Sequence, residues 1–251
     1  MDFRMAPRTG NPIPTVGAVI VAAGASTRMG GMDKIFVPLG DTTVLEHVVE
    51  KFEESSRVDS IVLVVAQGQS LWDAARLADA NGHWKKLGSI KAGGSRRQDS
   101  VALGLSVLPP CDLVIVHDGA RPLINSSLIN RGIDAALRTG AAIAAVRVKE
   151  TVKLAESTGK VIKTLDRSNI WISQTPQVFS RALLEKAHAE IEDDVTDDAA
   201  MVEKLGVDVT IFEGSYRNIK ITTSEDLQLA EILINSGVDH AADQEDPGKN
   251  N

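Results

Sequence analysis

Cysteine, long apolar runs and positive charge are all scarce in this sequence of 251 residues. Cys111 is the single cysteine, so no disulfide framework can form within the chain. No apolar run approaches the roughly 18 residues that a membrane-spanning helix needs. Residues 1–15 contain no apolar segment of the kind found in signal peptides. We therefore expect a cytoplasmic protein with no membrane segment.

The charge balance argues against one class of partner. Lysine and arginine number 27 against 34 aspartates and glutamates, which gives a net charge of −7. Non-specific nucleic-acid binding relies on an excess of basic side chains that neutralise phosphates, so we expect no nucleic-acid partner. This balance is still compatible with a local cationic pocket for a small anion.

Short apolar runs alternate with helical patterns along most of the chain. The runs are near-continuous, as in strands buried on both faces, and lie at 18–23, 60–66, 112–117 and 141–148. Helical patterns follow at 42–55, with a capping box of Thr43 and Glu46, at 95–108, with a capping box of Ser95 and Gln98, and at 126–140, ending at Gly140. This order predicts an α/β fold, a Rossmann-like three-layer sandwich whose mostly parallel sheet carries helices on both faces.

The second half of the chain departs from this alternation. Residues 149–170 alternate apolar and polar positions around the turn "ESTGK", which predicts a protruding β-hairpin arm. Further elements are expected as helices at about 180–190, 197–205 and 224–235, with Thr196 and Thr223 as N-caps of the last two and Gly206 as a C-cap, and as a strand at 208–213. We predict a single domain over 16–236, a flexible N-terminal arm over 1–15 and a disordered C-terminal tail over 237–251.

The stretch "AAGASTRMGGMDK" follows the first predicted strand, where open α/β sheets bind their ligands. A dinucleotide fingerprint is excluded, because Gly24 is followed by Ala25 and Ser26 and the second strand does not end in an acid. A P-loop is excluded because no Gly-Lys-Ser/Thr occurs here. Two interpretations remain: a tight glycine turn with a solvated arginine, or a loop that wraps a triphosphate with backbone N–H groups, Arg28 and Lys34.

Further motifs accompany this loop in a specific order. They are "AGGSRRQDSVALGL", "VHDGARPL", "ETVK", "DRSNIWISQTPQ", "VTDDAAMVEKLG" and "NIKITTSEDLQLAE". Together they resemble the 2-C-methyl-D-erythritol 4-phosphate cytidylyltransferase family over about residues 16–236. Ser95 departs from the family's pattern of an acid at this place of the GG-x-x-R segment, as some other members do.

The resemblance implies attack of a polyol phosphate on the α-phosphorus of CTP, with release of pyrophosphate. Because both reactants are anions, catalysis depends on positioning and electrostatic stabilisation. The implied catalytic residues are Arg28, Lys34, Arg167 and Lys220. The implied nucleotide-binding residues are Ala22, Ala23, Gly24, Gly93, Gly94, Ser95, Ser100, Asp118 and Gly119. The implied polyol-phosphate-binding residues are Asp118, Arg121, Thr151, Arg167, Thr175, Thr196 and Lys220.

The resemblance also implies Mg²⁺, held mainly by the CTP phosphates rather than by a protein cage. It implies a homodimer in which the arm brings Thr151 and Arg167 to the partner's site. Structural alternatives stay open for several positions: an Asp118–Arg121 ion pair that shapes its loop, Arg97 as a residue that fixes a loop, and a structural His117. A ribitol 5-phosphate cytidylyltransferase and an inactive nucleotide-binding module are the alternative functions.

Overall fold

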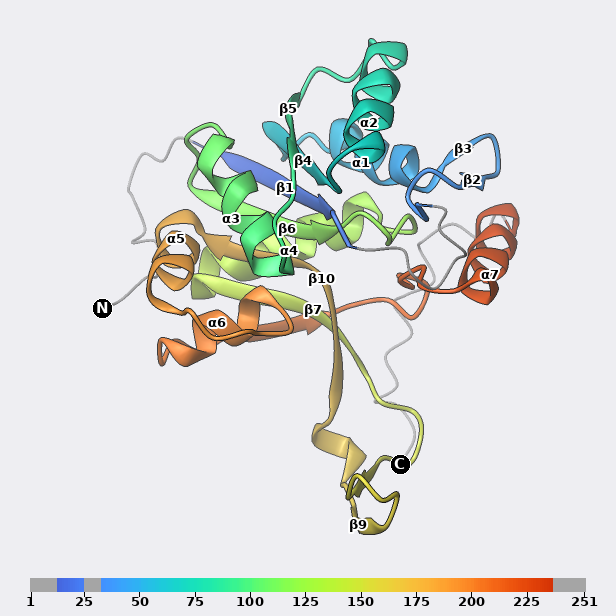
Figure 1. The fold of residues 1–251 in the computed structure, drawn as a ribbon. Helices are drawn as coiled ribbons and strands as arrows, with labels where there is room; N and C mark the ends of the chain where they lie inside the picture. The colour runs from blue at the N-terminus through green and yellow to red at the C-terminus, as the bar shows by residue number, and fades with distance from the viewer. Residues whose placement is uncertain (1–12, 25–32, 237–251) are drawn as a thin grey trace.

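A seven-stranded sheet forms the centre of the molecule (Figure 1). The computed structural model describes residues 13–24 and 33–236. The strands lie in the order β11-β7-β10-β6-β1-β4-β5. Their bounds are β1 Val16–Ala22, β4 Ser60–Val65, β5 Leu87–Ala92, β6 Leu113–Asp118, β7 Ala141–Arg147, β10 Trp171–Ser180 and β11 Thr210–Glu213. Only β10 runs antiparallel to its neighbours in this sheet, so the expectation of a mostly parallel sheet is confirmed.

Helices cover both faces of this sheet and bury its two apolar surfaces. One face packs against α1 Val44–Glu54, α2 Gln69–Ala80 and α4 Ser126–Thr139, and the other against α3 Arg97–Val107, α5 Arg181–Glu190 and α6 Asp198–Lys204. Strand β1 contributes to both cores, because Ala18 and Ile20 join the first cluster and Val19 and Val21 the second. The predicted three-layer sandwich is therefore confirmed.

A smaller apolar cluster attaches the last helix to the side of the sandwich. Helix α7, Ser224–Asn235, packs through Ala230 against Leu39 of the short strand β2, Pro38–Leu39, which pairs with β3, Thr42–Thr43. Ile221 lies in the same cluster and hydrogen-bonds through its N–H to the Ala120 carbonyl. This attachment brings the segment before α7 to the sheet edge where β6 ends.

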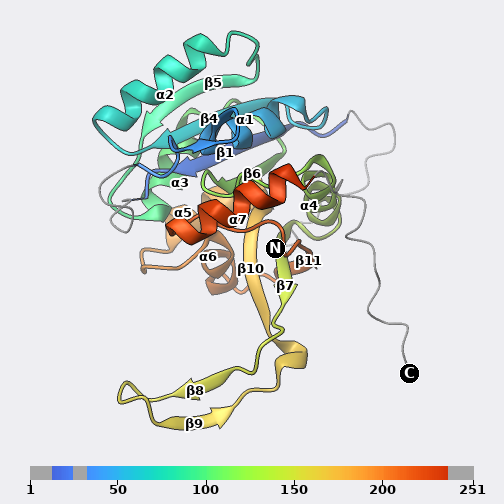
Figure 2. The ribbon, with the colours of Figure 1, turned by 90° about the vertical axis from the view of Figure 1, so that its right-hand side faces the viewer.

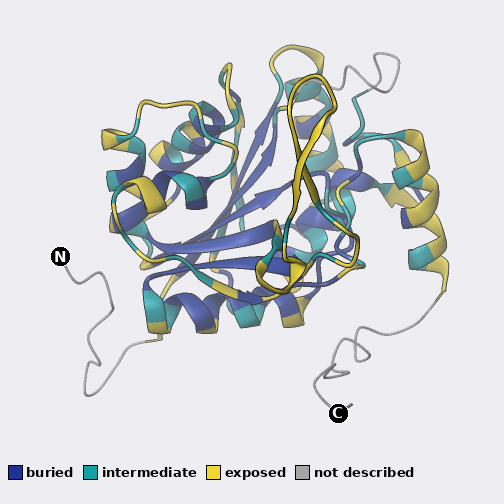
Figure 3. Cartoon of the chain, turned by 90° about the horizontal axis from the view of Figure 1, so that it is seen from below, coloured by how far each residue is buried: buried dark blue, intermediate teal, exposed yellow. Residues whose placement is uncertain are grey.

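The predicted hairpin projects from the sheet as an arm (Figures 2 and 3). It contains β8 Lys153–Ala155, β9 Val161–Thr164 and the 3₁₀ turn Arg167–Asn169. Gly159 has a φ of +86°, which explains the glycine in the predicted turn. Leu154, Val161 and Ile162 are 43%, 53% and 56% exposed, so the arm buries little of its apolar surface within one chain.

Several local predictions were wrong. The α3 capping box is formed by Arg96 and Asp99, because Asp99 accepts the Arg96 N–H, whereas Gln98 contacts the 193–195 segment. Helix α6 is capped by Asp197, not by Thr196. The expected C-terminal tail, 237–251, lies outside the described residues, and so does the expected N-terminal arm except for residues 13–15. Thr15, expected in that arm, hydrogen-bonds to Asp112 through its backbone N–H and its hydroxyl.

Candidate active site

A cavity of about 440 Å³ opens where β1, β5 and β6 end. Carboxyl ends of parallel strands meet at one sheet edge, so residues distant in sequence are brought together there. Its lining comprises Val21, Ala22, Ala23, Gly24, Lys34, Ile35, Gly94, Ser95, Arg96, Arg97, Ser100, Asp118, Ala120 and Lys220. Most of the predicted nucleotide-binding residues therefore lie around one cavity.

Glycines let three backbone segments approach closely beside this cavity. A Cβ atom on Gly93 would lie 2.3 Å from the Ala23 Cβ and 2.7 Å from the Ser100 Oγ. A Cβ atom on Gly119 would lie 2.7 Å from the Ala22 Cβ. Gly93 and Gly119 thus stand directly behind the lining and permit its compact backbone, although neither residue lines the cavity itself.

A second cavity of about 230 Å³ adjoins the first. It is lined by Arg97, Asp118, Arg121, Ser173, Gln174, Thr175, Gln177, Thr196, Asp197 and Lys220. Arg97, Asp118 and Lys220 line both cavities. The register of β10 against β7 shifts between Ser173 and Gln177, and this irregularity turns the middle of β10 toward the second cavity.

Three cations face the carboxylate of Asp118 at the junction. The Lys220 Nζ, Arg97 Nε and Arg121 Nε lie 2.9, 3.4 and 3.5 Å from its oxygens. Burial alone would raise the pKa of Asp118, but Arg97, Lys220 and Arg121 outweigh it and hold this pKa well below its ordinary value. The junction therefore carries a permanently ionised carboxylate with three cations around it, and these cations can also interact with phosphate groups.

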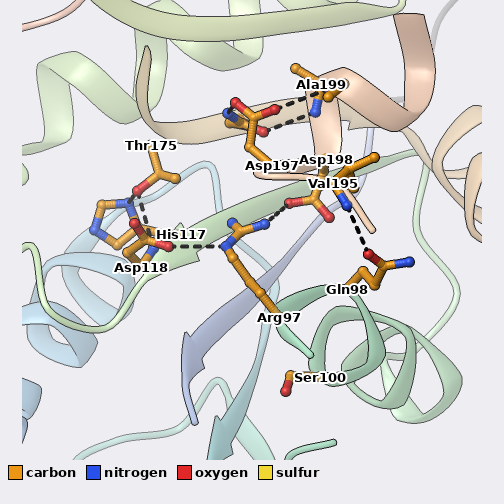
Figure 4. Close-up of polar contacts among 12 residues, drawn as sticks. Arg97, Gln98, Ser100, His117, Asp118, Thr175, Val195, Asp197, Asp198 and Ala199 are labelled. Atoms are coloured by element: carbon orange, nitrogen blue, oxygen red, sulfur yellow. Dashed lines mark hydrogen bonds and ion pairs between the residues drawn. The ribbon is translucent and has the colours of Figure 1, made fainter. Parts of the chain in front are cut away.

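Arg97 is held from behind by a second, fully buried carboxylate (Figure 4). Its Nη1 lies 2.5 Å from the Asp198 Oδ2, and the other oxygen of Asp198 lies 3.3 Å from the His188 Nε2. The Arg97 side chain is 23% exposed, so this guanidinium spans the distance between buried α6 and the cavities. These contacts agree with the interpretation of Arg97 as a residue that fixes a loop. The sequence did not predict Asp198 as its partner, because the two residues lie 101 positions apart.

Ser95, which departs from the resembled pattern, has an acid beside it. Ser95 donates its hydroxyl to the Asp99 Oδ2 at 2.9 Å, and the Arg96 guanidinium contacts the same carboxylate. These contacts lower the pKa of Asp99 to about 2, with the Arg96 hydrogen bonds as the main cause. Asp99 is thus a charged group next to the cavity that the sequence analysis did not consider.

The structure gathers most, but not all, of the predicted substrate-binding residues. Arg121, Thr175, Thr196, Asp118 and Lys220 line the second cavity. Thr151 and Arg167 line neither cavity, because both are exposed on the arm, where the Arg167 guanidinium donates to the Lys149 carbonyl. Arg28 lies outside the described residues. Ser173, Gln174 and Gln177 were missed, since polar residues of an irregular strand give no periodic signal. Asp197, the N-cap of α6, was also missed.

His117 is buried inside the protein, and its ring nitrogens contact other protein groups. Within residues 13–24 and 33–236, no group of three or more His, Cys, Asp or Glu side chains is arranged to hold a metal ion. Across the same ranges, no helix combines the length and the apolar character needed to cross a membrane.

The α/β sandwich, the glycine-lined cavity at its strand ends and the cationic junction define a nucleotidyltransferase. The family model for 2-C-methyl-D-erythritol 4-phosphate cytidylyltransferase matches residues 16–236. A protein of that name from Dehalococcoides mccartyi is 48% identical over 88% of this chain and 97% of its own length. The chain therefore belongs to the 2-C-methyl-D-erythritol 4-phosphate cytidylyltransferase family.

Solved structures agree with this assignment. The 4-diphosphocytidyl-2C-methyl-D-erythritol synthase of Anaerococcus prevotii superimposes with a TM-score of 0.78 at 30% identity, over 88% of this chain and 96% of that one. The 2-C-methyl-D-erythritol 4-phosphate cytidylyltransferase of Thermus thermophilus gives 0.72 at 32% identity, over 88% and 99%. These relatives support the main functional prediction over the ribitol phosphate and inactive-module alternatives.

Proposed function

We propose that this enzyme transfers the cytidylyl group of CTP to 2-C-methyl-D-erythritol 4-phosphate, giving 4-diphosphocytidyl-2-C-methyl-D-erythritol and pyrophosphate, in the cytoplasmic non-mevalonate route to isoprenoid precursors. The observation that carries this proposal is the pair of adjoining cavities that share Arg97, Asp118 and Lys220. A transfer between two phosphorylated substrates needs two neighbouring anion sites whose reacting atoms meet at a common boundary.

The first cavity suits CTP. In our proposal the backbone around Ala22, Ala23 and Gly24 carries the nucleotide, and Gly93, Gly94, Ser95, Ser100 and Gly119 shape its base and ribose site. The absence of side chains at Gly93 and Gly119 supports this, because it lets the backbone segments around the cavity lie close together. Lys34 lines this cavity, and together with Arg28 it would offset charge at the α-phosphorus and on the leaving pyrophosphate.

Mg²⁺ fits this site as an ion held mostly by the substrate. Asp118 is the single acidic side chain among the described residues that line the first cavity, and Mg²⁺ typically takes one or two carboxylates together with phosphate oxygens and waters. When bound, the ion would neutralise phosphate charge. Asp118 would orient the nucleotide beside it.

The second cavity suits the polyol phosphate. Arg121 and Lys220 would hold the phosphate dianion, and Thr196 would offer a hydroxyl to the polyol. The Lys220 side chain is 39% exposed, and its Nζ lies 2.9 Å from the Asp118 Oδ2. Because this ammonium group is partly open to solvent, it can turn toward an entering phosphate. In-line attack on CTP at the boundary of the two cavities would then release pyrophosphate.

We further propose a homodimer in which the arm delivers Thr151 and Arg167 to the partner's site. The exposed Leu154, Val161 and Ile162 support this, since an arm of this kind needs a surface to cover its apolar side chains. Mixing Arg167→Ala with Lys34→Ala subunits should restore part of the activity, because some mixed sites contain neither substitution. Absence of any recovery in verified heterodimers would show that the arm acts within its own chain.

Pyrophosphate release with CTP and Mg²⁺ tests the overall proposal. Parallel reactions would contain 2-C-methyl-D-erythritol 4-phosphate or ribitol 5-phosphate. We expect release with the first alone. Release with ribitol 5-phosphate alone would move the enzyme to another pathway, and no release by a folded, CTP-binding protein would favour an inactive module.

A further inference from the structure

His117 joins two residues of the cavity junction from inside the protein. It lies in β6 directly before Asp118, is fully buried, and stands against the Phe52 ring at 5.3 Å between centroids. Its Nε2 lies 3.3 Å from the Arg121 carbonyl oxygen, and its Nδ1 lies 3.0 Å from the Thr175 Oγ1.

The directions of these hydrogen bonds follow from the chemistry of the partners. The Arg121 carbonyl can only accept, so the proton sits on the His117 Nε2. Burial lowers the pKa of His117 to about 3, with Arg121 and Lys220 also opposing its charge and Asp118 favouring it. The imidazole is therefore neutral at pH 7, and its Nδ1 accepts the hydroxyl proton of Thr175.

The Thr175 hydroxyl extends this chain to Asp118. Its oxygen accepts the backbone N–H of Asp118 at 3.0 Å while its proton goes to His117 (Figure 4). Thr175 is only 3% exposed, and its backbone carbonyl accepts a hydrogen bond from the Asn218 side-chain amide at 2.7 Å. Its proton and one of its two lone pairs are thus engaged within the protein.

We propose that His117 is a positioning residue of the active site, and that it acts on Asp118 through the Thr175 hydroxyl. A continuous chain runs from the Asp118 N–H through the Thr175 hydroxyl and His117 to the Arg121 carbonyl. It fixes both ends of the turn that carries the Asp118 carboxylate and the Arg121 guanidinium. The inference rests on the proposed function in so far as these two groups bind CTP and the polyol phosphate.

The two cavities make the proposal testable. Thr175 lines the second cavity but not the first, whereas Asp118 lines both. A threonine that touched only the polyol would influence the KM for the polyol phosphate alone. A threonine that positions Asp118 influences CTP as well.

The experiment compares Thr175→Val, which removes the hydroxyl at nearly constant shape, with Thr175→Ser, which keeps it. We expect Thr175→Val to weaken CTP binding, measured by calorimetry with Mg²⁺, about 10-fold and to lower kcat/KM for the polyol phosphate about 100-fold, as for a misplacement near 1 Å. Thr175→Ser should restore most of both. Thr139→Val is the control, because that hydroxyl bonds to the Ala135 and Ala141 carbonyls away from the site.

Nitrogen-15 spectra of the unaltered protein and of Thr175→Val test the same inference independently of turnover. We expect His117 to show a protonated Nε2 and an unprotonated Nδ1 throughout pH 6–8, and Thr175→Val to shift the Nδ1 signal. Unchanged CTP affinity in folded Thr175→Val, or a His117 that is protonated on Nδ1, would overturn the proposal. Calorimetry and spectra also remain informative if the enzyme uses another polyol phosphate, so failure of the proposed function is distinguishable.

Discussion

Substituting Gly93 by alanine would separate the segments that form the nucleotide cavity. The new Cβ would lie 2.3 Å from the Ala23 Cβ, whereas carbon atoms in contact normally stand about 3.5–4.0 Å apart. The two segments must therefore move apart by about 1 Å or more. The Ser100 Oγ, 2.7 Å from the same position and bonded to the Gly94 N–H, would be displaced with them.

A displacement of about 1 Å at a reacting geometry costs roughly 100-fold in rate. We expect kcat/KM for CTP to fall by about that factor in Gly93→Ala. The strained packing should lower the free energy of unfolding by about 1–3 kcal/mol, so most of the protein stays folded at 25 °C. Pyrophosphate release at varied CTP, together with urea unfolding, measures both quantities.

Gly88→Ala provides the matched control on β5. A Cβ there would meet only the Lys86 carbonyl oxygen, at 4.0 Å, so activity and stability should stay close to those of the unaltered enzyme. A Gly93→Ala enzyme with unchanged kcat/KM for CTP would refute the proposed nucleotide site. An equal loss in both variants would refute the steric argument.

Three further predictions concern charge. Arg28→Ala and Lys34→Ala should each lower kcat about 100-fold or more with little change in urea unfolding; unchanged turnover in both would contradict their roles. Asp198→Asn should lower the free energy of unfolding by about 3 kcal/mol because a buried ion pair is broken, whereas Asp193→Asn, at an exposed pair, should cost below about 1 kcal/mol. Burial lowers the pKa of His117 to about 3 in the folded protein, so below about pH 6.5 the unfolded chain binds a proton that the folded chain does not. Acidification from pH 7 to 5 should therefore lower the free energy of unfolding by about 2 kcal/mol. A urea midpoint that does not change over this range would exclude a neutral buried imidazole.

The sequence predicted those elements whose burial leaves a strong periodic signal. Strands β1, β4, β6 and β7 are almost entirely buried, so their apolar runs were visible. Strand β5 is only partly buried, and α2 buries Ala74 alone, so neither gave a pattern to detect. Strand β10 was missed as a member of the central sheet because polar residues and Pro176 interrupt its apolar pattern between Ile172 and Val178.

The candidate site was predictable where it follows strand ends along the chain. Gly24, Gly94 and Asp118 each lie at or just after such an end, and parallel strands collect these ends at one edge. The pairing of Arg97 with Asp198 was not predictable, because two charged residues 101 positions apart carry no local signature of their contact. The predicted caps Thr43, Gly140 and Thr223 were confirmed, whereas those of α3 and α6 were wrong by one residue. At α6 the neighbouring Thr196 and Asp197 are both good N-cap residues, so the sequence does not decide between them.

Strand β10 connects the arm to the second cavity. It begins at Trp171, at the base of the arm where Arg147 stacks on the indole at 4.3 Å, and passes through Thr175 and Gln177 at the second cavity. A displacement of the arm is therefore transmitted along this one strand to the groups around Asp118. In the proposed homodimer, the contact of the arm with the partner subunit and the shape of the second cavity would therefore depend on the same strand.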